Sequence, residues 1–108
     1  MVGINLTILY PNNDDIKFNF EYFVGTHVPK LTAALKDQGL VGWEVVKYSH
    51  GADGGVPAYQ AGLILKWDDK EKLQAARDGP VKAELVADLA NFSNQKPTVL
   101  AGGIVSSS

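Results

Sequence analysis

Strand-like and helix-like hydrophobic patterns alternate along this sequence of 108 residues, and their order restricts the possible folds more than any other feature. Residues 2–10 carry apolar side chains at every second position, which is the period of a β-strand. The other segments are strand-like at 40–49, 58–67 and 98–105 and helical at 15–37 and 68–92. The order β-α-β-β-α-β predicts a single α+β domain over residues 1–108, with the ferredoxin-like fold: helices on one face of a four-stranded antiparallel sheet.

Proline and glycine predict where the helices bend. Pro29 has no amide N–H, and its ring presses on the carbonyl four residues earlier, at Gly25. We therefore expect two helical pieces or one bent helix in the first helical region. Gly79-Pro80 divides the second region, because proline suits the first turn of a new helix.

Capping residues predict where the helices begin. Asp14 or Asp15 is expected to cap the first helix, since a short acidic side chain can accept from the free backbone N–H groups. Asp68, followed three residues later by Glu71, has the pattern of a capping box and predicts the start of the second helical region.

Three of the four predicted strands carry apolar or small side chains on both faces. The alternating sets are Val41, Trp43 and Val45 against Gly42, Val46 and Tyr48; Tyr59, Leu63 and Leu65 against Ala58, Gly62 and Ile64; and Val99, Ala101 and Val105 against Leu100 and Ile104. One layer of helices covers only one face, and a large apolar surface usually marks an interface. We therefore expect a homodimer through the open sheet faces; the alternative is that small residues tolerate exposure.

Composition excludes several classes of function. The net charge is −2 and no basic run is present, so nucleic acid is not an expected partner. The absence of cysteine removes disulfides, thiolate metal sites and a cysteine nucleophile. No stretch approaches the roughly 20 apolar residues of a membrane helix. We see no signal peptide, no cofactor motif and no metal-ligand spacing, so we expect a cytoplasmic protein that uses no metal or cofactor.

His27 is the strongest candidate for chemistry. It lies on the apolar stripe of the first helix, one turn from Phe23 and one turn from Leu31, so it should face the sheet and be shielded from water. A shielded histidine can stay neutral and act as a general base. It can equally be a structural residue that is satisfied by a backbone carbonyl or a hydroxyl. The other histidine, His50, lies beside a glycine-rich loop and is expected to be exposed.

Aromatic residues form a second group of candidates. They are expected to lie on strands or helices near His27: Tyr10, Tyr22, Phe23, Trp43, Tyr48 and Tyr59. Aromatic walls with a few polar groups are typical of a pocket for a flat or apolar small molecule. The same residues would also make an ordinary hydrophobic core.

Two motifs resemble those of a known family. The first is an aromatic pair followed by His-x-Pro, here Tyr22-Phe23 and Thr26-His27-Val28-Pro29, with Tyr10-Pro11 upstream. The second is Ala87-Asp88-Leu89-Ala90-Asn91-Phe92-Ser93. Together they are similar to the EthD family, which is named for ethyl tert-butyl ether degradation, and the resemblance covers about residues 4–102. The sequence departs from the family's pattern at Phe18 and Phe20 and at Lys30.

The resemblance implies a dimeric α+β barrel and a small apolar or aromatic ligand. The superfamily includes cofactor-independent monooxygenases, dehydratases and isomerases, so His27 would be a general base and no cofactor would be needed. The resemblance also allows a protein that binds a compound, or assists a partner oxygenase, without turnover. A third possibility is haem binding with His27 as the axial ligand.

Overall fold

A four-stranded antiparallel sheet forms one layer of the protein. The computed structural model describes residues 3–12 and 17–107. The strands are β1 (Ile4–Pro11), β2 (Leu40–Lys47), β3 (Tyr59–Trp67) and β4 (Thr98–Gly103). Their order in the sheet is β2-β3-β1-β4, so the two strands from the ends of the chain pair at one side and β4 forms an edge.

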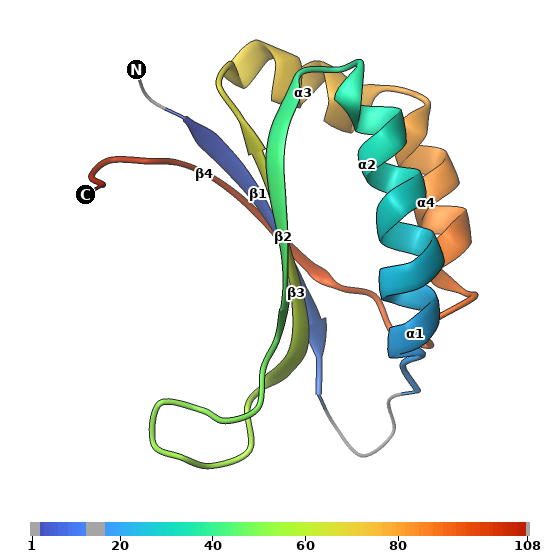
Figure 1. Cartoon of the computed structure of the whole chain (residues 1–108), viewed down its shortest axis with the longest axis vertical. Helices are drawn as coiled ribbons and strands as arrows, with labels where there is room; N and C mark the ends of the chain where they lie inside the picture. Colours follow the sequence, from blue (N-terminus) through green and yellow to red (C-terminus); the bar gives the residue numbers. More distant parts are fainter. Residues whose placement is uncertain (1–2, 13–16, 108) are drawn as a thin grey trace.

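The helices form the second layer and all lie on the same face of the sheet (Figure 1). The first helical region contains α1 (Phe20–Tyr22), a π-helical segment η1 (Phe23–His27) and α2 (Val28–Lys36). The second contains α3 (Lys70–Asp78) and α4 (Val81–Leu89). The predicted ferredoxin-like α+β fold is therefore confirmed. None of the helices described is both long enough and apolar enough to cross a membrane.

The first helical region departs from a regular α-helix close to Pro29 and Gly25, as those two residues predict. The departure is a π-helical segment, in which Val28 N–H donates to the carbonyl of Phe23, five residues earlier. Pro29 has no N–H to give to the carbonyl of Gly25, so the regular α-helical pattern cannot continue through this point. Residues 23–27 therefore wind into the wider turn, which places His27 at its C-terminal end.

The helix starts differ from the predicted ones. The first helix begins at Phe20, and its N-cap is Asn19, whose side chain accepts from Tyr22 N–H at 3.1 Å. The predicted caps, Asp14 and Asp15, lie outside the described residues. In the second region the cap is Asp69, not Asp68. Its carboxylate accepts from Glu71 N–H at 2.8 Å, because the extended backbone at position 69 points the side chain at the free N–H groups.

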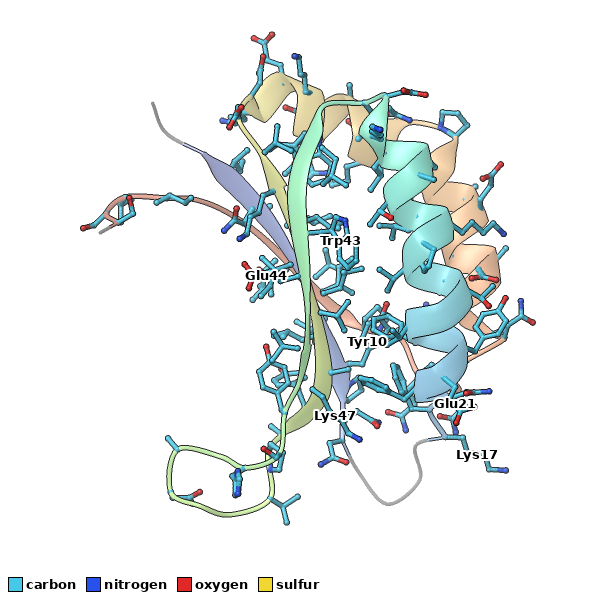
Figure 2. All side chains as sticks on the ribbon, in the orientation of Figure 1. Tyr10, Lys17, Glu21, Trp43, Glu44 and Lys47 are labelled. Atoms are coloured by element: carbon cyan, nitrogen blue, oxygen red, sulfur yellow. The ribbon has the colours of Figure 1, made fainter. Side chains whose placement is uncertain are left out.

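The two faces of the sheet differ in composition. The helix-facing side packs into the core with Tyr10, Leu63, Leu65 and Trp67, and Trp43 points the same way. The outer face carries apolar side chains and an ion pair between Glu44 and Lys66. Its apolar members are Leu9, Val46, Tyr48, Ile64 and Leu100. Figure 2 shows Glu44 on this outer side. The outer face is therefore less uniformly apolar than the sequence pattern predicts.

Candidate functional site

A buried histidine–aspartate pair lies between the helices and the sheet. His27 comes from the π-helical segment and Asp88 from the last turn of α4, so the pair joins the two helical regions. Nδ1 of His27 is 2.7 Å from Oδ2 of Asp88, and the residues are only 2% and 5% exposed. Water is therefore a weak competitor for this hydrogen bond.

Two further side chains hold Asp88. The Tyr22 hydroxyl donates to Oδ1 of Asp88 at 2.7 Å, and the Asn91 amide donates to the same oxygen at 3.0 Å. Asn91 also lies 3.4 Å from the Tyr22 hydroxyl oxygen. The carboxylate thus accepts three hydrogen bonds, which fix its plane and, through it, the orientation of the His27 ring.

The electrostatics fix which nitrogen of His27 carries the proton. Burial acts to raise the pKa of Asp88, but the hydrogen bonds from His27, Tyr22 and Asn91 outweigh it and lower this pKa to about 2. Asp88 is therefore ionised at neutral pH and can only accept, so Nδ1 of His27 must be the donor. Burial lowers the pKa of His27 below its usual value, although the carboxylate opposes this shift. The ring is neutral at pH 7, with an unprotonated Nε2.

Aromatic rings enclose the imidazole. The centre of the Phe92 ring lies 4.4 Å from the centre of the His27 ring, and Phe23 stacks on it at 5.8 Å with an angle of 19° between the planes. Because these apolar rings cannot solvate a charge, they are the physical source of the lowered pKa. They also prevent the imidazole from rotating away from Asp88.

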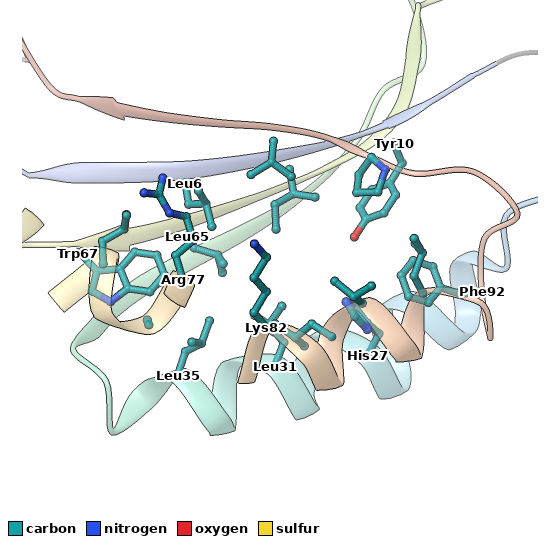
Figure 3. Close-up of a pocket in the computed structure, with 18 residues that line it drawn as sticks. Leu6, Tyr10, His27, Leu31, Leu35, Leu65, Trp67, Arg77, Lys82 and Phe92 are labelled. Carbon is teal, nitrogen blue, oxygen red and sulfur yellow. The ribbon is translucent and has the colours of Figure 1, made fainter. Parts of the chain in front are cut away.

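A cavity of about 180 Å³ lies beside His27, between α2, α3, α4 and the sheet (Figure 3). It is lined almost entirely by apolar side chains: Leu6, Ile8, Leu31, Leu35, Leu65, Trp67, Leu73, Ala76, Leu85, Val86, Leu89, Phe92, Pro97 and Val99. The lining residues that are exposed lie on the last turn of α3, on α4 and on β4, so the cavity opens to solvent between these helices and the sheet edge.

Tyr10 and His27 are the polar groups in the buried part of this cavity. Figure 3 shows them on opposite walls, with the Tyr10 hydroxyl pointing from the sheet toward the helices. Neither this hydroxyl nor Nε2 of His27 has a hydrogen-bond partner among the residues that the structure describes. Burial raises the pKa of Tyr10 far above its usual value, so the hydroxyl stays protonated. The buried part of the cavity thus offers one donor and one acceptor to a bound molecule.

The other predicted pocket residues lie at different distances from this cavity. Tyr22 contacts Asp88 on the far side of the histidine, and Phe23 is a core residue behind the imidazole; neither lines the cavity. Trp43 lies on β2 and is 47% exposed. Tyr48 lies on the outer face of the sheet, over Gly62. Tyr59 begins β3, opposite Pro11. The structure therefore brings together His27, Tyr10, Tyr22 and Phe23, and leaves the other three apart.

Sequence reasoning missed Asp88 and Asn91 as parts of the site. Asp88 lies 61 residues from His27, so no local spacing joins them. One signal was available: Asp88 falls on the apolar stripe of α4, between Leu85 and Phe92, where an ionisable side chain must be buried. A buried carboxylate needs donors, and the neutral histidine of the first helix is an available one. In the described part of the chain, no group of three or more histidine and acidic side chains could hold a metal ion.

Solved structures similar to this one include two from the EthD family. An EthD-like protein from Ralstonia eutropha JMP134 has a TM-score of 0.86 and 26% sequence identity, over 98% of this chain and 95% of that chain. An EthD family protein from Bacillus halodurans C-125 has a TM-score of 0.72 and 22% identity, over 93% of this chain and 96% of that chain. No protein-family model and no curated protein matches the sequence.

More distant structures share the fold alone. A protein from Bacteroides fragilis, described as dimeric with a ferredoxin-like fold, has a TM-score of 0.61 at 11% identity, over 95% of this chain and 96% of that chain. A cofactor-independent oxygenase from Streptomyces nogalater has a TM-score of 0.58 at 14% identity, over 99% and 93%. The resemblance to the EthD family, predicted from two sequence motifs, is thus confirmed in structure over nearly the whole chain.

Proposed function

We propose that the cavity binds an apolar or aromatic small molecule and that His27 acts on it as a general base. The observation that carries this proposal is the state of the imidazole: Nδ1–H is held by an ionised Asp88, while the unprotonated Nε2 borders an apolar cavity. The fold-level likeness to EthD-like proteins and to a cofactor-independent oxygenase supports a function on small molecules.

The size of the cavity limits the ligand. A dry cavity of about 150 Å³ can hold benzene, so the space beside His27, about 180 Å³, suits one ring with a short substituent. Haem has four pyrrole rings and would require the helices to separate from the sheet. The volume therefore favours a one-ring compound over haem with His27 as the axial ligand.

The chemistry of the pair favours proton abstraction. A histidine with a lowered pKa is mostly in its base form at pH 7, and the carboxylate behind it stabilises the imidazolium that forms when it takes a proton. Tyr10 can donate a hydrogen bond to an oxygen of the substrate as negative charge develops there. Suitable substrates carry an acidic C–H or O–H next to an apolar ring.

An isotope-exchange experiment tests this proposal. Phenylacetone is a one-ring ketone whose acidic C–H exchanges with deuterium under base catalysis, and NMR in D₂O follows that exchange. We expect the protein to accelerate it, and His27→Gln to lose most of the acceleration, about 100-fold or more. Trp67 lines the cavity and Trp43 does not, so Trp67 fluorescence in a Trp43→Phe background reports binding separately.

The two readouts separate catalysis from mere binding. Binding without exchange would reject the general base and leave a carrier or an auxiliary protein for a partner oxygenase. If His27→Gln leaves both binding and exchange unchanged, His27 takes no part in the reaction. If phenylacetone neither binds nor exchanges, while a set of other one-ring ketones and phenols also fails to change Trp67 emission, the cavity is not a ligand site.

We also propose a homodimer through the outer faces of two sheets. The proposal rests on the apolar side chains of this face, among them the exposed Leu100 and the half-buried Leu9 and Ile64. Light scattering at micromolar concentration would test it: a mass of one 11.6 kDa chain contradicts the proposal, and twice that mass supports it.

A further inference from the structure

Two cations border the open side of the cavity. Arg77 lies in the last turn of α3 and Lys82 in the first turn of α4, and both line the cavity although they are exposed to solvent. The break at Gly79-Pro80 brings them to one side, because it ends one helix and starts the next within three residues. Figure 3 shows Arg77 near Trp67, and Lys82 directed between the helices and the sheet.

Neither cation is neutralised by a neighbour. The ion pairs found among the described residues are His27–Asp88 and Lys66–Glu44, so neither Arg77 nor Lys82 has a carboxylate within ion-pair distance. The rest of the cavity wall is apolar apart from Tyr10 and His27. Positive charge is therefore present at one place on the wall and has no structural partner there.

We propose that the ligand is amphiphilic: a one-ring apolar body that carries a carboxylate or another anionic group. The anionic group would lie at the opening, with Arg77 and Lys82, while the ring fills the apolar space and the reactive end reaches His27. The order of the residues along the cavity supports this orientation, because Figure 3 shows Arg77 beside Trp67 at one end, His27 and Tyr10 toward the other end, and Lys82 between them. This inference rests on the proposed function and specifies its substrate class.

The physical argument is charge complementarity at an apolar site. An anion beside two cations keeps part of its hydration at the opening, so it loses little solvation there. Each exposed ion pair contributes only modestly to affinity, because water competes with it. Two of them give an expected preference of about five- to tenfold for an anion over a neutral isostere at low salt, and screening should reduce it as salt rises.

The test compares two probes of the same shape, 4-ethylbenzoate and 4-ethylbenzamide. The indole N–H of Trp67 donates to the carbonyl of Gln38, and its NMR resonance reports occupancy of the cavity. Affinities are measured for the wild-type protein, for Arg77→Gln/Lys82→Gln, and for Lys36→Gln/Lys70→Gln. The last variant removes the same charge from exposed positions that do not line the cavity.

We expect the wild type and the control variant to bind the benzoate five- to tenfold more tightly than the benzamide. The Arg77→Gln/Lys82→Gln variant should bind the two probes about equally, because it loses the preference for the anion. Equal affinities in the wild type, or an equal loss in the control variant, would overturn the anionic ligand and leave the proposed function intact. Failure of both probes to shift the Trp67 resonance would overturn the binding site itself.

Discussion

Asp88→Asn is the change that most directly tests how the site works. The amide at position 88 is isosteric with the carboxylate, but it presents one acceptor and one donor where Asp88 presents two acceptors. With Tyr22 and Asn91 donating to its oxygen, the amide nitrogen faces Nδ1 of His27. Nδ1 must then accept, so the proton of the neutral ring moves to Nε2. The nitrogen that borders the cavity changes from a base to a donor.

The magnitude of the effect on stability follows from the pKa of Asp88. A value of about 2 in the folded protein, against an ordinary value of 3.8, corresponds to about 2 kcal/mol of stabilisation by the ionised form. The ionised carboxylate contributes this stabilisation in full at pH values above the pKa that Asp88 has in the unfolded chain, near 4. The stabilisation is lost as the pH falls toward 2. The variant should therefore be about 2 kcal/mol less stable at pH 7 and lose less stability in acid.

His27 adds a second dependence on pH, of known sign. Because burial lowers its pKa in the folded state, the unfolded chain binds more protons just below the usual histidine pKa, and stability rises with pH through that window. Asp88 partly opposes this lowering, so Asp88→Asn should lower the pKa of His27 further. The rise in stability with pH below about 6.5 should then be steeper in the variant.

Urea unfolding from pH 2.5 to 7.5, at one fixed chain concentration, measures both effects. Asp78→Asn, an exposed carboxylate at the end of α3, is the matched control and should change stability by less than about 0.5 kcal/mol. NMR of the His27 ring nitrogens reports the tautomer. If Nε2 stays unprotonated in Asp88→Asn, Asp88 does not set the tautomer of His27. If the stability difference from the wild type is the same at pH 3 and pH 7, ionised Asp88 does not stabilise the fold.

Three other substitutions, one of them with a matched control, test separate parts of the structure. Tyr22→Phe removes one of the three hydrogen bonds to Asp88, so it should raise the pKa of that carboxyl. The free energy of unfolding at pH 7 should fall by about 1 kcal/mol, which is less than the loss expected for Asp88→Asn. The same urea unfolding experiment measures it. Gly39→Ala puts a side chain on a backbone with a φ of +90°, so it should lower the free energy of unfolding by about 1–3 kcal/mol. Gly102→Ala is the control, because a Cβ there meets no atom within 4 Å, and it should lower that free energy by less than about 1 kcal/mol. Leu100→Glu places a charge on the outer face of the sheet, so it should convert the proposed dimer to a monomer. Sedimentation velocity measures the change, and an unchanged circular dichroism spectrum would show that the fold is intact. A dimer that persists in this variant would reject that interface.

The sequence predicted the order of elements because each element has a strong local signal. The alternation that predicts the first strand and the breaks at Pro29 and Gly79-Pro80 depend on neighbours in the chain, and the described residues follow all three, with β1 at Ile4–Pro11. Helix starts were predicted less well. Several acidic and amide side chains compete at each start, and the backbone conformation, not the residue type, decides that Asn19 and Asp69 are the caps.

The candidate site could be predicted only in part, because its members come from distant segments. The helical stripe located His27, and the first strand located Tyr10, since each faces the core by local periodicity. Trp43 has the same periodicity, but its strand, β2, lies at the edge away from the cavity. Strand order in the sheet is a long-range property, and so is the pairing of His27 with Asp88, which depends on how α4 packs beside the first helical region.

The π-helical segment explains how one continuous helical region aligns four residues along the core. In a regular α-helix, side chains four residues apart point in directions that differ by about 40° around the helix axis. From Phe23 to Leu35 there are three such steps, so the directions would differ by about 120°. That is more than the width of an apolar stripe, about 100°. Yet Phe23, His27, Leu31 and Leu35 are all buried. One turn of a π-helix contains more than four residues, so a step of four residues completes less than one turn. The side-chain direction then rotates in the opposite sense across this segment, which cancels part of the rotation that the α-helical steps produce. Pro29 removes the hydrogen bond that would keep the α-helical turn, and thereby holds His27 in line with the leucines of α2 that line the cavity.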